Sequence, residues 1–248
     1  MKVLAPVELT EPLQSKTPQV AVKTAIRVGG VDYSLHISKI PSLASFVKLQ
    51  KAAQPETTEF IHGPIPLFDV ALRGLESGYR QCFRSLPVDL SQHRTLCETY
   101  KFLNIDVLNH MSLDAIIVNL KVGKADYDVD YGHRPIRGNK ELARDTAFQL
   151  LYLMLLSQLE NETKDVQKLY NVVMFVVSHP GTFKYRMKRV IRATYEMRFS
   201  ITMKQRLRLD EWEKKGAGSG EDDATTEEEP AYYYDLDEAF DRYDSDRS

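Results

Sequence analysis

Two amphipathic helical patterns, separated by clear stop and start signals, are the feature of this sequence that most constrains its fold. The first pattern follows Pro66, which suits a first helical turn because its missing N–H would have no helical partner there. Gly78 stands where a helix favours a left-handed closing residue. Between these two signals, a helix would place four apolar residues on one face: Leu67, Val70, Ala71 and Leu75.

The second pattern begins at Asp89, which suits an N-cap, and Gln92 completes a capping-box-like pair three residues later. Leu96, Tyr100 and Leu103 then form an apolar stripe. A linker is expected between the two helices. Because neither helix can bury its stripe alone, each requires a partner surface elsewhere in the fold.

The residues before this helix pair predict a small β-structure and one further helix. Gly29 and Gly30 favour a tight hairpin turn, because glycine tolerates positive φ. The predicted order is a poorly ordered arm over residues 1–19, strands over 25–28 and 31–37, a helix over 41–51 and a short strand over 59–62.

This order, together with three segments, resembles a BTB/POZ domain over residues 25–108. The segments are Val28–His36, which is similar to the opening hairpin of the family, and the helical stretches Leu67–Gly78 and Thr95–Leu108. The resemblance implies an α+β fold with a small sheet flanked by helices. It also implies a protein–protein interaction module that acts by self-association or partner docking.

The resemblance places the expected interface on the first helix, with exposed apolar side chains around Leu43, Phe46 and Val47 available to a second copy. The expected partner is therefore another protein, with a homodimer as one form. Cullin-3 is a further partner that the family suggests. Residues 50–58, however, lack the hydrophobic-x-Glu signature of Cullin-3 adaptors.

Beyond Leu108 the sequence predicts a helical domain and then a charged end. Helices are expected over 113–121, 139–159, 164–178, 183–199 and 202–215, with a loop over 123–139. The domain prediction is an arm over 1–19, a BTB/POZ-like domain over 20–110, a helical domain over 111–215 and a disordered acidic tail over 216–248.

Charge is distributed unevenly along the chain. Residues 216–248 contain twelve acidic residues and two arginines, a net charge of −10, whereas residues 1–215 carry a net charge of +8. The basic residues cluster between Lys184 and Arg208, with a candidate basic patch of Lys184, Arg186, Lys188, Arg189 and Arg192. One interpretation is a nucleic-acid-associated regulator. We favour a solvated helix face partly neutralised by the acidic tail, because that tail would compete with nucleic acid.

No pattern in the sequence predicts catalysis, a metal or a cofactor. The six histidines show no metal-ligand spacing, and the alternating Asp126, Asp128 and Asp130 lack the glycine and glutamate of a calcium loop. No secretion signal or membrane span is apparent, and the two cysteines show no metal-ligand spacing. We therefore expect an intracellular protein of the cytoplasm or nucleus, not an enzyme, that needs no cofactor.

Overall fold

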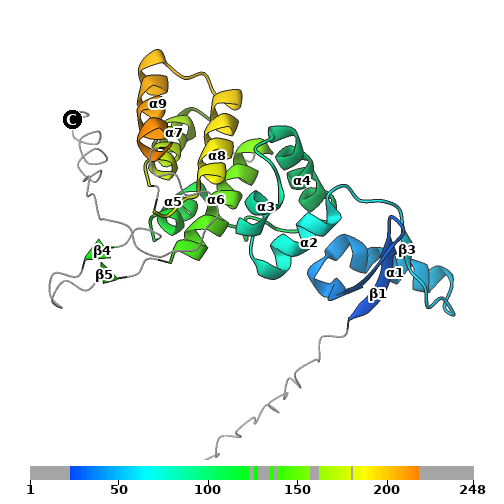
Figure 1. Ribbon diagram of the computed structural model, residues 1–248. Helices are drawn as coiled ribbons and strands as arrows, with labels where there is room; N and C mark the ends of the chain where they lie inside the picture. The colour runs from blue at the N-terminus through cyan, green and yellow to red at the C-terminus, as the bar shows by residue number, and fades with distance from the viewer. Residues whose placement is uncertain are drawn as a thin grey trace, which may run out of the picture. The chain divides into compact units, whose positions relative to one another are not determined.

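The computed structural model describes residues 23–122, 126–127, 135–136, 139–156, 162–179 and 181–217. The chain has a mixed α+β fold that is mostly helical, with one three-stranded sheet (Figure 1). It forms two compact units. The first unit comprises Met1–Pro66 and Tyr100–Ile105, and the second comprises Leu67–Thr99 and Asp106–Ser248.

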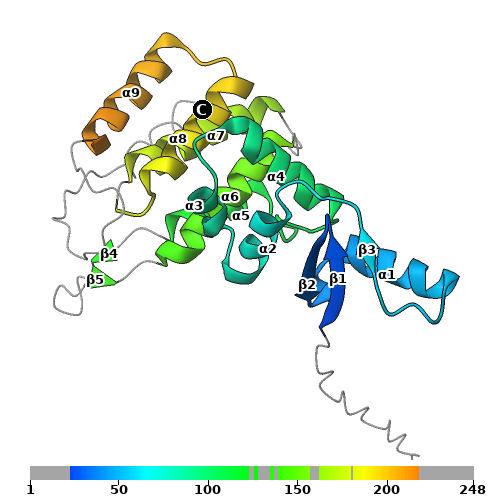
Figure 2. The same cartoon turned by 45° about the vertical axis from the view of Figure 1, so that its right-hand side comes forward.

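The first unit is built on the predicted hairpin (Figure 2). Strands β1 (Thr24–Val28) and β2 (Val31–Leu35) pair antiparallel, and Gly29 and Gly30 have φ values of 58° and 89° in the turn. Strand β3 (Ile61–His62) lies parallel to β1 on its other side, so the strand order is β2-β1-β3. The hairpin and the third strand confirm the sequence-based expectation.

A helix connects the hairpin to β3. A short 3-10 turn, η1 (Ile37–Lys39), leads into helix α1 (Pro41–Ala53), which has proline at its start as predicted. The backbone N–H of Ser42 donates to the Leu103 carbonyl at 3.2 Å, and its hydroxyl donates to the Phe102 carbonyl at 2.6 Å. These two bonds hold the start of α1 against the only part of the later chain that belongs to the first unit.

The helix pair of the sequence analysis is present, with two differences. Helix α2 (Phe68–Ser77) begins after Pro66 because Leu67 has a left-handed φ of 51°, so the prediction that Pro66 lies in the first turn is wrong. Gly78 closes α2 with a φ of 90°, as predicted. The predicted linker contains helix α3 (Arg80–Ser85), which forms because Cys82 and Phe83 are buried.

Helix α4 (Leu90–Phe102) confirms the predicted cap and stripe. The Asp89 carboxylate accepts a hydrogen bond of 2.9 Å from the backbone N–H of Ser91, which satisfies a free donor of the first turn. The predicted stripe of Leu96, Tyr100 and Leu103 is fully buried. The last residues of α4 belong to the first unit and the preceding ones to the second.

Five further helices in the described part of the second unit confirm the helices predicted beyond Leu108. They are α5 (Leu113–Lys121), α6 (Lys140–Leu155), α7 (Glu162–Ser178), α8 (Tyr185–Arg198) and α9 (Met203–Ala217). Ser112 caps α5 through a bond from the Ala115 N–H, and Asn139 caps α6 through a bond from the Leu142 N–H.

Four predictions differ from the structure or lie outside the described residues. Helix α6 ends at Leu155, four residues before the predicted end, and residues 157–161 lie outside the described residues. The predicted loop over 123–139 contains a short antiparallel pair, β4 (Asp126–Tyr127) and β5 (Pro135–Ile136). The predicted arm over 1–19 lies outside the described residues, as does the acidic segment from residue 218 onward.

Helix α6 is the centre of the second unit. Its residues from Thr146 to Leu155 are all buried, because α3, α5 and α8 pack around it (Figure 1). Gln149 is a polar residue in this core, and its side-chain amide donates to the Val107 carbonyl at 2.9 Å, which offsets the cost of its burial. Helices α2, α3 and most of α4 belong to this unit, whereas the predicted domain over residues 20–110 included them. The domain boundaries inferred from the resemblance stay predictions.

Candidate interaction surfaces

The residues of the predicted interface on α1 differ in their burial. Leu43 and Val47 are buried in the core of the first unit, one helical turn apart on the inward face of α1. The expectation that these two side chains are exposed is therefore wrong, because the hydrophobic core of the small unit takes up both of them. Phe46 is half-buried at the edge of the same face. An interface that includes α1 stays a prediction.

Phe46 instead belongs to a surface made by α1, β3 and the end of α4. Its ring lies edge-on to His62 with 4.9 Å between ring centroids, and His62 lies 6.1 Å from the ring of Phe102. Leu49 is nearly one turn after Phe46 on α1. We call Phe46, Leu49, His62 and Phe102 the aromatic surface.

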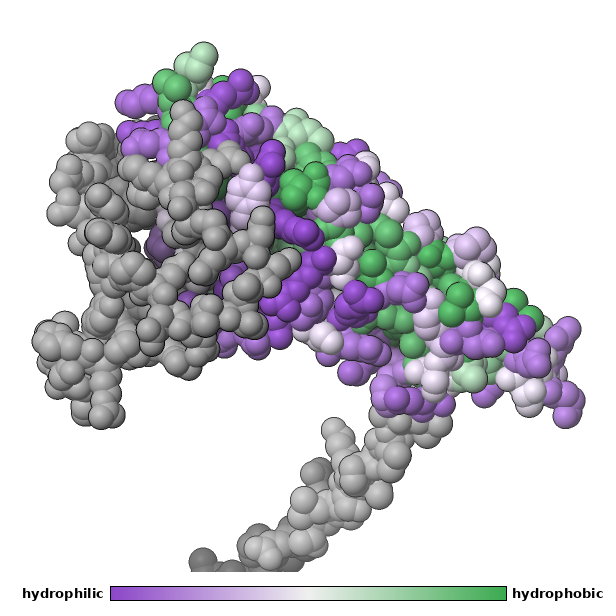
Figure 3. Space-filling view, in the orientation of Figure 1, coloured by the Kyte–Doolittle hydropathy of each residue, from purple (hydrophilic) through white to green (hydrophobic). Residues whose placement is uncertain are grey.

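Two members of the aromatic surface are large apolar side chains that face solvent. Leu49 is 70% exposed and Phe102 is 55% exposed. In the space-filling view, hydrophobic side chains emerge among hydrophilic ones over the region of α1 and β3 (Figure 3). Exposed apolar residues that lie next to one another are typical of interaction sites, whereas single exposed residues are common on any surface.

The sequence-based prediction of an interface on the first helix did not include Leu49, His62 or Phe102. Phe102 does not belong to the buried stripe of α4, so the helical periodicity predicts no packing contact for its side chain. The sequence signal for Phe102 was its position on the polar side of an amphipathic helix, where a large apolar side chain is unexpected.

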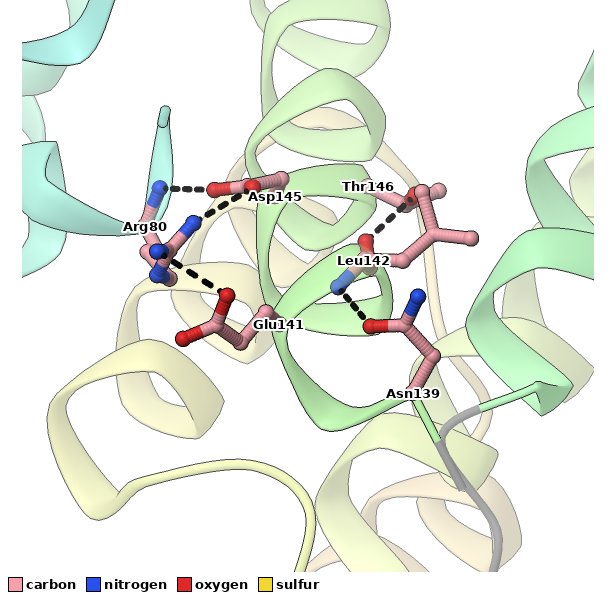
Figure 4. Close-up of polar contacts among 6 residues, drawn as sticks. All are labelled: Arg80, Asn139, Glu141, Leu142, Asp145 and Thr146. Carbon is pink, nitrogen blue, oxygen red and sulfur yellow. Dashed lines mark hydrogen bonds and ion pairs between the residues drawn. The ribbon is translucent and has the colours of Figure 1, made fainter. Parts of the chain in front are cut away.

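A half-buried ion pair fixes the turn between α2 and α3 to the central helix. The Asp145 carboxylate accepts hydrogen bonds from the backbone N–H of Arg80 at 2.7 Å and from its guanidinium at 2.8 Å (Figure 4). Glu141 lies one turn earlier on α6 and contacts the same guanidinium at 3.3 Å. Gly78 is next to this pair, and a Cβ atom there would lie 2.8 Å from the Asp145 oxygens. This arrangement has a structural role in the second unit.

The predicted basic patch is not a uniform row of free cations. Arg192 is largely buried, and its guanidinium forms ion pairs with Glu196, at 2.8 Å, and with Asp210 of α9. Arg189 lies over the ring of Tyr185. Lys184 and Arg186 are exposed and Lys188 is half-buried. Arg192 therefore joins α8 to α9, and the nucleic-acid interpretation stays a prediction for the remaining members.

Three titratable side chains, those of His93, Cys82 and Cys97, are buried in the protein core. His93 is fully buried, its Nδ1 donates to the Asp89 carbonyl at 2.9 Å, and desolvation lowers its pKa below the ordinary 6.5. Cys82 and Cys97 are both buried free thiols, and burial raises the pKa of Cys97 well above its ordinary value. A thiol with a raised pKa is a poor nucleophile.

Metal binding and membrane insertion find no support in the described ranges. Among the residues described, no group of three or more histidine, cysteine or acidic side chains could hold a metal ion. Within the same part of the chain, every helix is too short or too polar to cross a bilayer.

Comparison with known proteins gives no relative for this chain: no family model, no curated protein and no solved structure matches it.

Proposed function

We propose that this protein is a protein–protein interaction module whose BTB/POZ-like part associates with a second copy through the aromatic surface. The element order supports a BTB/POZ-like assignment, since a hairpin, a helix, a short strand and a helix pair follow one another as the resemblance implies. The observation that carries the proposal is the exposure of Leu49 and Phe102 beside the Phe46–His62 ring contact.

The energetic gain from covering this surface is substantial for a small interface. Fully burying a leucine or phenylalanine side chain is worth about 1.5–3 kcal/mol, and more than half of each side chain here is still exposed. Each residue therefore has roughly 1–2 kcal/mol left to gain. In a two-fold symmetric dimer the same surface occurs on both copies, so each position contributes twice.

The test is the mass of the full chain by light scattering over a wide range of protein concentration. We use the full chain because α4 contributes to both units, and a fragment ending near residue 110 would divide the second one. Substituting Leu49→Asp or Phe102→Asp should raise the dimer dissociation constant at least roughly 30-fold, which corresponds to about 2 kcal/mol.

Val118→Asp provides the matched control, because Val118 is 62% exposed on α5 in the second unit. Circular dichroism confirms that each variant keeps its helices. A wild-type protein that stays monomeric at every concentration contradicts self-association. Equal weakening by Val118→Asp and Leu49→Asp contradicts the assignment of the interface to the aromatic surface.

Docking of a different partner is the second form of this proposal, and purified Cullin-3 is its direct probe. Because residues 50–58 lack the adaptor signature, we expect no complex with Cullin-3 in size-exclusion chromatography. A stable complex that Leu49→Asp disrupts would show that the aromatic surface serves a hetero-partner.

A further inference from the structure

The beginning of α9 carries an unusual mixture of exposed apolar and exposed basic side chains. Met203 is 72% exposed and Leu207 is 61% exposed, one helical turn apart on the same side of α9. Figure 3 shows hydrophobic atoms bordered by hydrophilic ones at the top of the view, where α9 begins. Lys204, Arg206 and Arg208 are exposed between and beside them. We call these five residues the α9 surface.

The five residues of the α9 surface carry a net positive charge. Residues 203–208 contain three cations and no acidic residue. The next acidic residues are Asp210, which forms an ion pair with Arg192 of α8, and the exposed Glu211. Arg208 also lies beside Tyr170, but it remains exposed. A ligand for this surface must therefore be anionic, and it must also offer apolar groups to Met203 and Leu207.

The same chain contains a segment with this composition. Residues 221–248 hold twelve acidic residues, and the large apolar ones lie among them: Tyr232, Tyr233, Tyr234, Leu236, Phe240 and Tyr243. The acidic groups match the three cations, and the aromatic rings match the exposed Met203 and Leu207, since methionine sulfur packs favourably against aromatic rings.

The length of chain between the two segments suits this contact. Helix α9 ends at Ala217, so the α9 surface lies 9 to 14 residues back along the helix, about 14–21 Å away at about 1.5 Å per residue. The stretch over residues 218–232 lies between them, and a flexible chain of that length has a root-mean-square span of about 21 Å. Tethered binding is strongest when the linker span matches the distance between sites.

Nucleic acid is the competing anionic ligand for a basic surface. Phosphate contacts use lysine and arginine and would leave Met203 and Leu207 exposed. The segment over residues 221–248 contains groups that match both kinds of side chain, and covalent attachment raises the local concentration of a tethered ligand. The chemistry therefore favours the segment of the same chain.

We propose that residues 221–248 dock on the α9 surface of their own chain and shield its cations from other anionic partners. This contact is independent of the aromatic surface, which lies in the first unit.

Limited chymotrypsin digestion of the full chain tests the proposal, because chymotrypsin cleaves after the tyrosines at 232–234. A synthetic peptide of residues 228–238 in the same buffer corrects for the effect of salt on the protease. We expect cleavage at these tyrosines to be at least tenfold slower in 50 mM than in 500 mM NaCl, since salt screens the attraction. The triple charge reversal Lys204→Glu, Arg206→Glu and Arg208→Glu should abolish that protection at low salt.

The matched control reverses three exposed cations elsewhere, at Lys39, Arg94 and Lys140, with the same change in net charge. The control should keep the protection. The α9 variant should stay folded, because glutamate in the first turns of a helix is favoured by the helix dipole. Met203→Ser with Leu207→Ser should reduce protection without any change of charge.

Three outcomes would overturn the proposal. The first is equal cleavage rates in the wild-type protein and the α9 charge reversal. The second is an equal loss of protection in the control, which would indicate a nonspecific charge effect. The third concerns a duplex oligonucleotide that binds the intact full chain. If the α9 charge reversal abolishes this binding but leaves the rate of tyrosine cleavage unchanged, the surface binds nucleic acid instead.

Discussion

The ion pair between Arg80 and Asp145 should be the most costly single polar contact to remove from the second unit. Substituting Asp145→Ala deletes the acceptor of two charge-assisted hydrogen bonds, from the Arg80 backbone N–H and from its guanidinium. Breaking a fully buried pair costs about 3–5 kcal/mol, and the side chains here are 21% and 24% exposed. We therefore expect a loss of about 2–3 kcal/mol, which lowers the melting temperature by roughly 4–12 °C.

Urea unfolding followed by far-ultraviolet circular dichroism measures this loss, because the second unit contains most of the helices. Asp145→Asn keeps an oxygen acceptor for the Arg80 N–H but loses the charge, so it should cost about 1 kcal/mol. Glu141→Ala removes an exposed partner of the same guanidinium and should cost less than about 0.5 kcal/mol. Equal losses for Asp145→Ala and Glu141→Ala would show that the half-buried Arg80–Asp145 pair contributes no more to stability than an exposed ion pair.

Two further predictions concern the second unit. Gly78→Ala should lower the free energy of unfolding by about 1–3 kcal/mol in the same urea assay. The cause is that Gly78 has a φ of 90° and that a Cβ there would press on the Asp145 carboxylate. A loss below about 0.5 kcal/mol would contradict this expectation. His93 has a folded-state pKa below its unfolded value of 6.5, so the unfolded chain binds more protons below that pH. The free energy of unfolding should therefore fall as the pH decreases below 6.5, by at most about 1.4 kcal/mol per pH unit. His93→Gln should flatten this dependence between pH 6.5 and 5, and an unchanged slope would contradict the assignment.

The order of local elements could be predicted from the sequence because each depends on neighbouring residues. The hairpin follows from Gly29 and Gly30, whose positive φ values other residues rarely adopt. The starts of α5 and α6 follow from Ser112 and Asn139, which cap their helices through bonds within three residues. The stripe of α4 follows from periodicity alone.

Predictions failed where a distant contact decides the local structure. Helix α3 lies where a linker was expected, because Cys82 and Phe83 are buried in the second unit. The exposure expected for Leu43 and Val47 depended on how the small first unit fills its core. Periodicity shows that a helix has an apolar face, but it does not show whether that face meets the same chain or another one.

The hairpin, the helices other than α3, and the charge contrast between residues 1–215 and 216–248 could be derived from the sequence alone, as could the lack of a recognisable catalytic motif. These properties follow from composition and from contacts within a few residues. That Phe46, His62 and Phe102 form one surface, and that Arg192 pairs with Asp210, is visible only in the folded chain. The members of each contact are 16 to 40 residues apart in the sequence. Such residues meet only because the packing of whole helices and strands brings them together, and no local pattern encodes that packing.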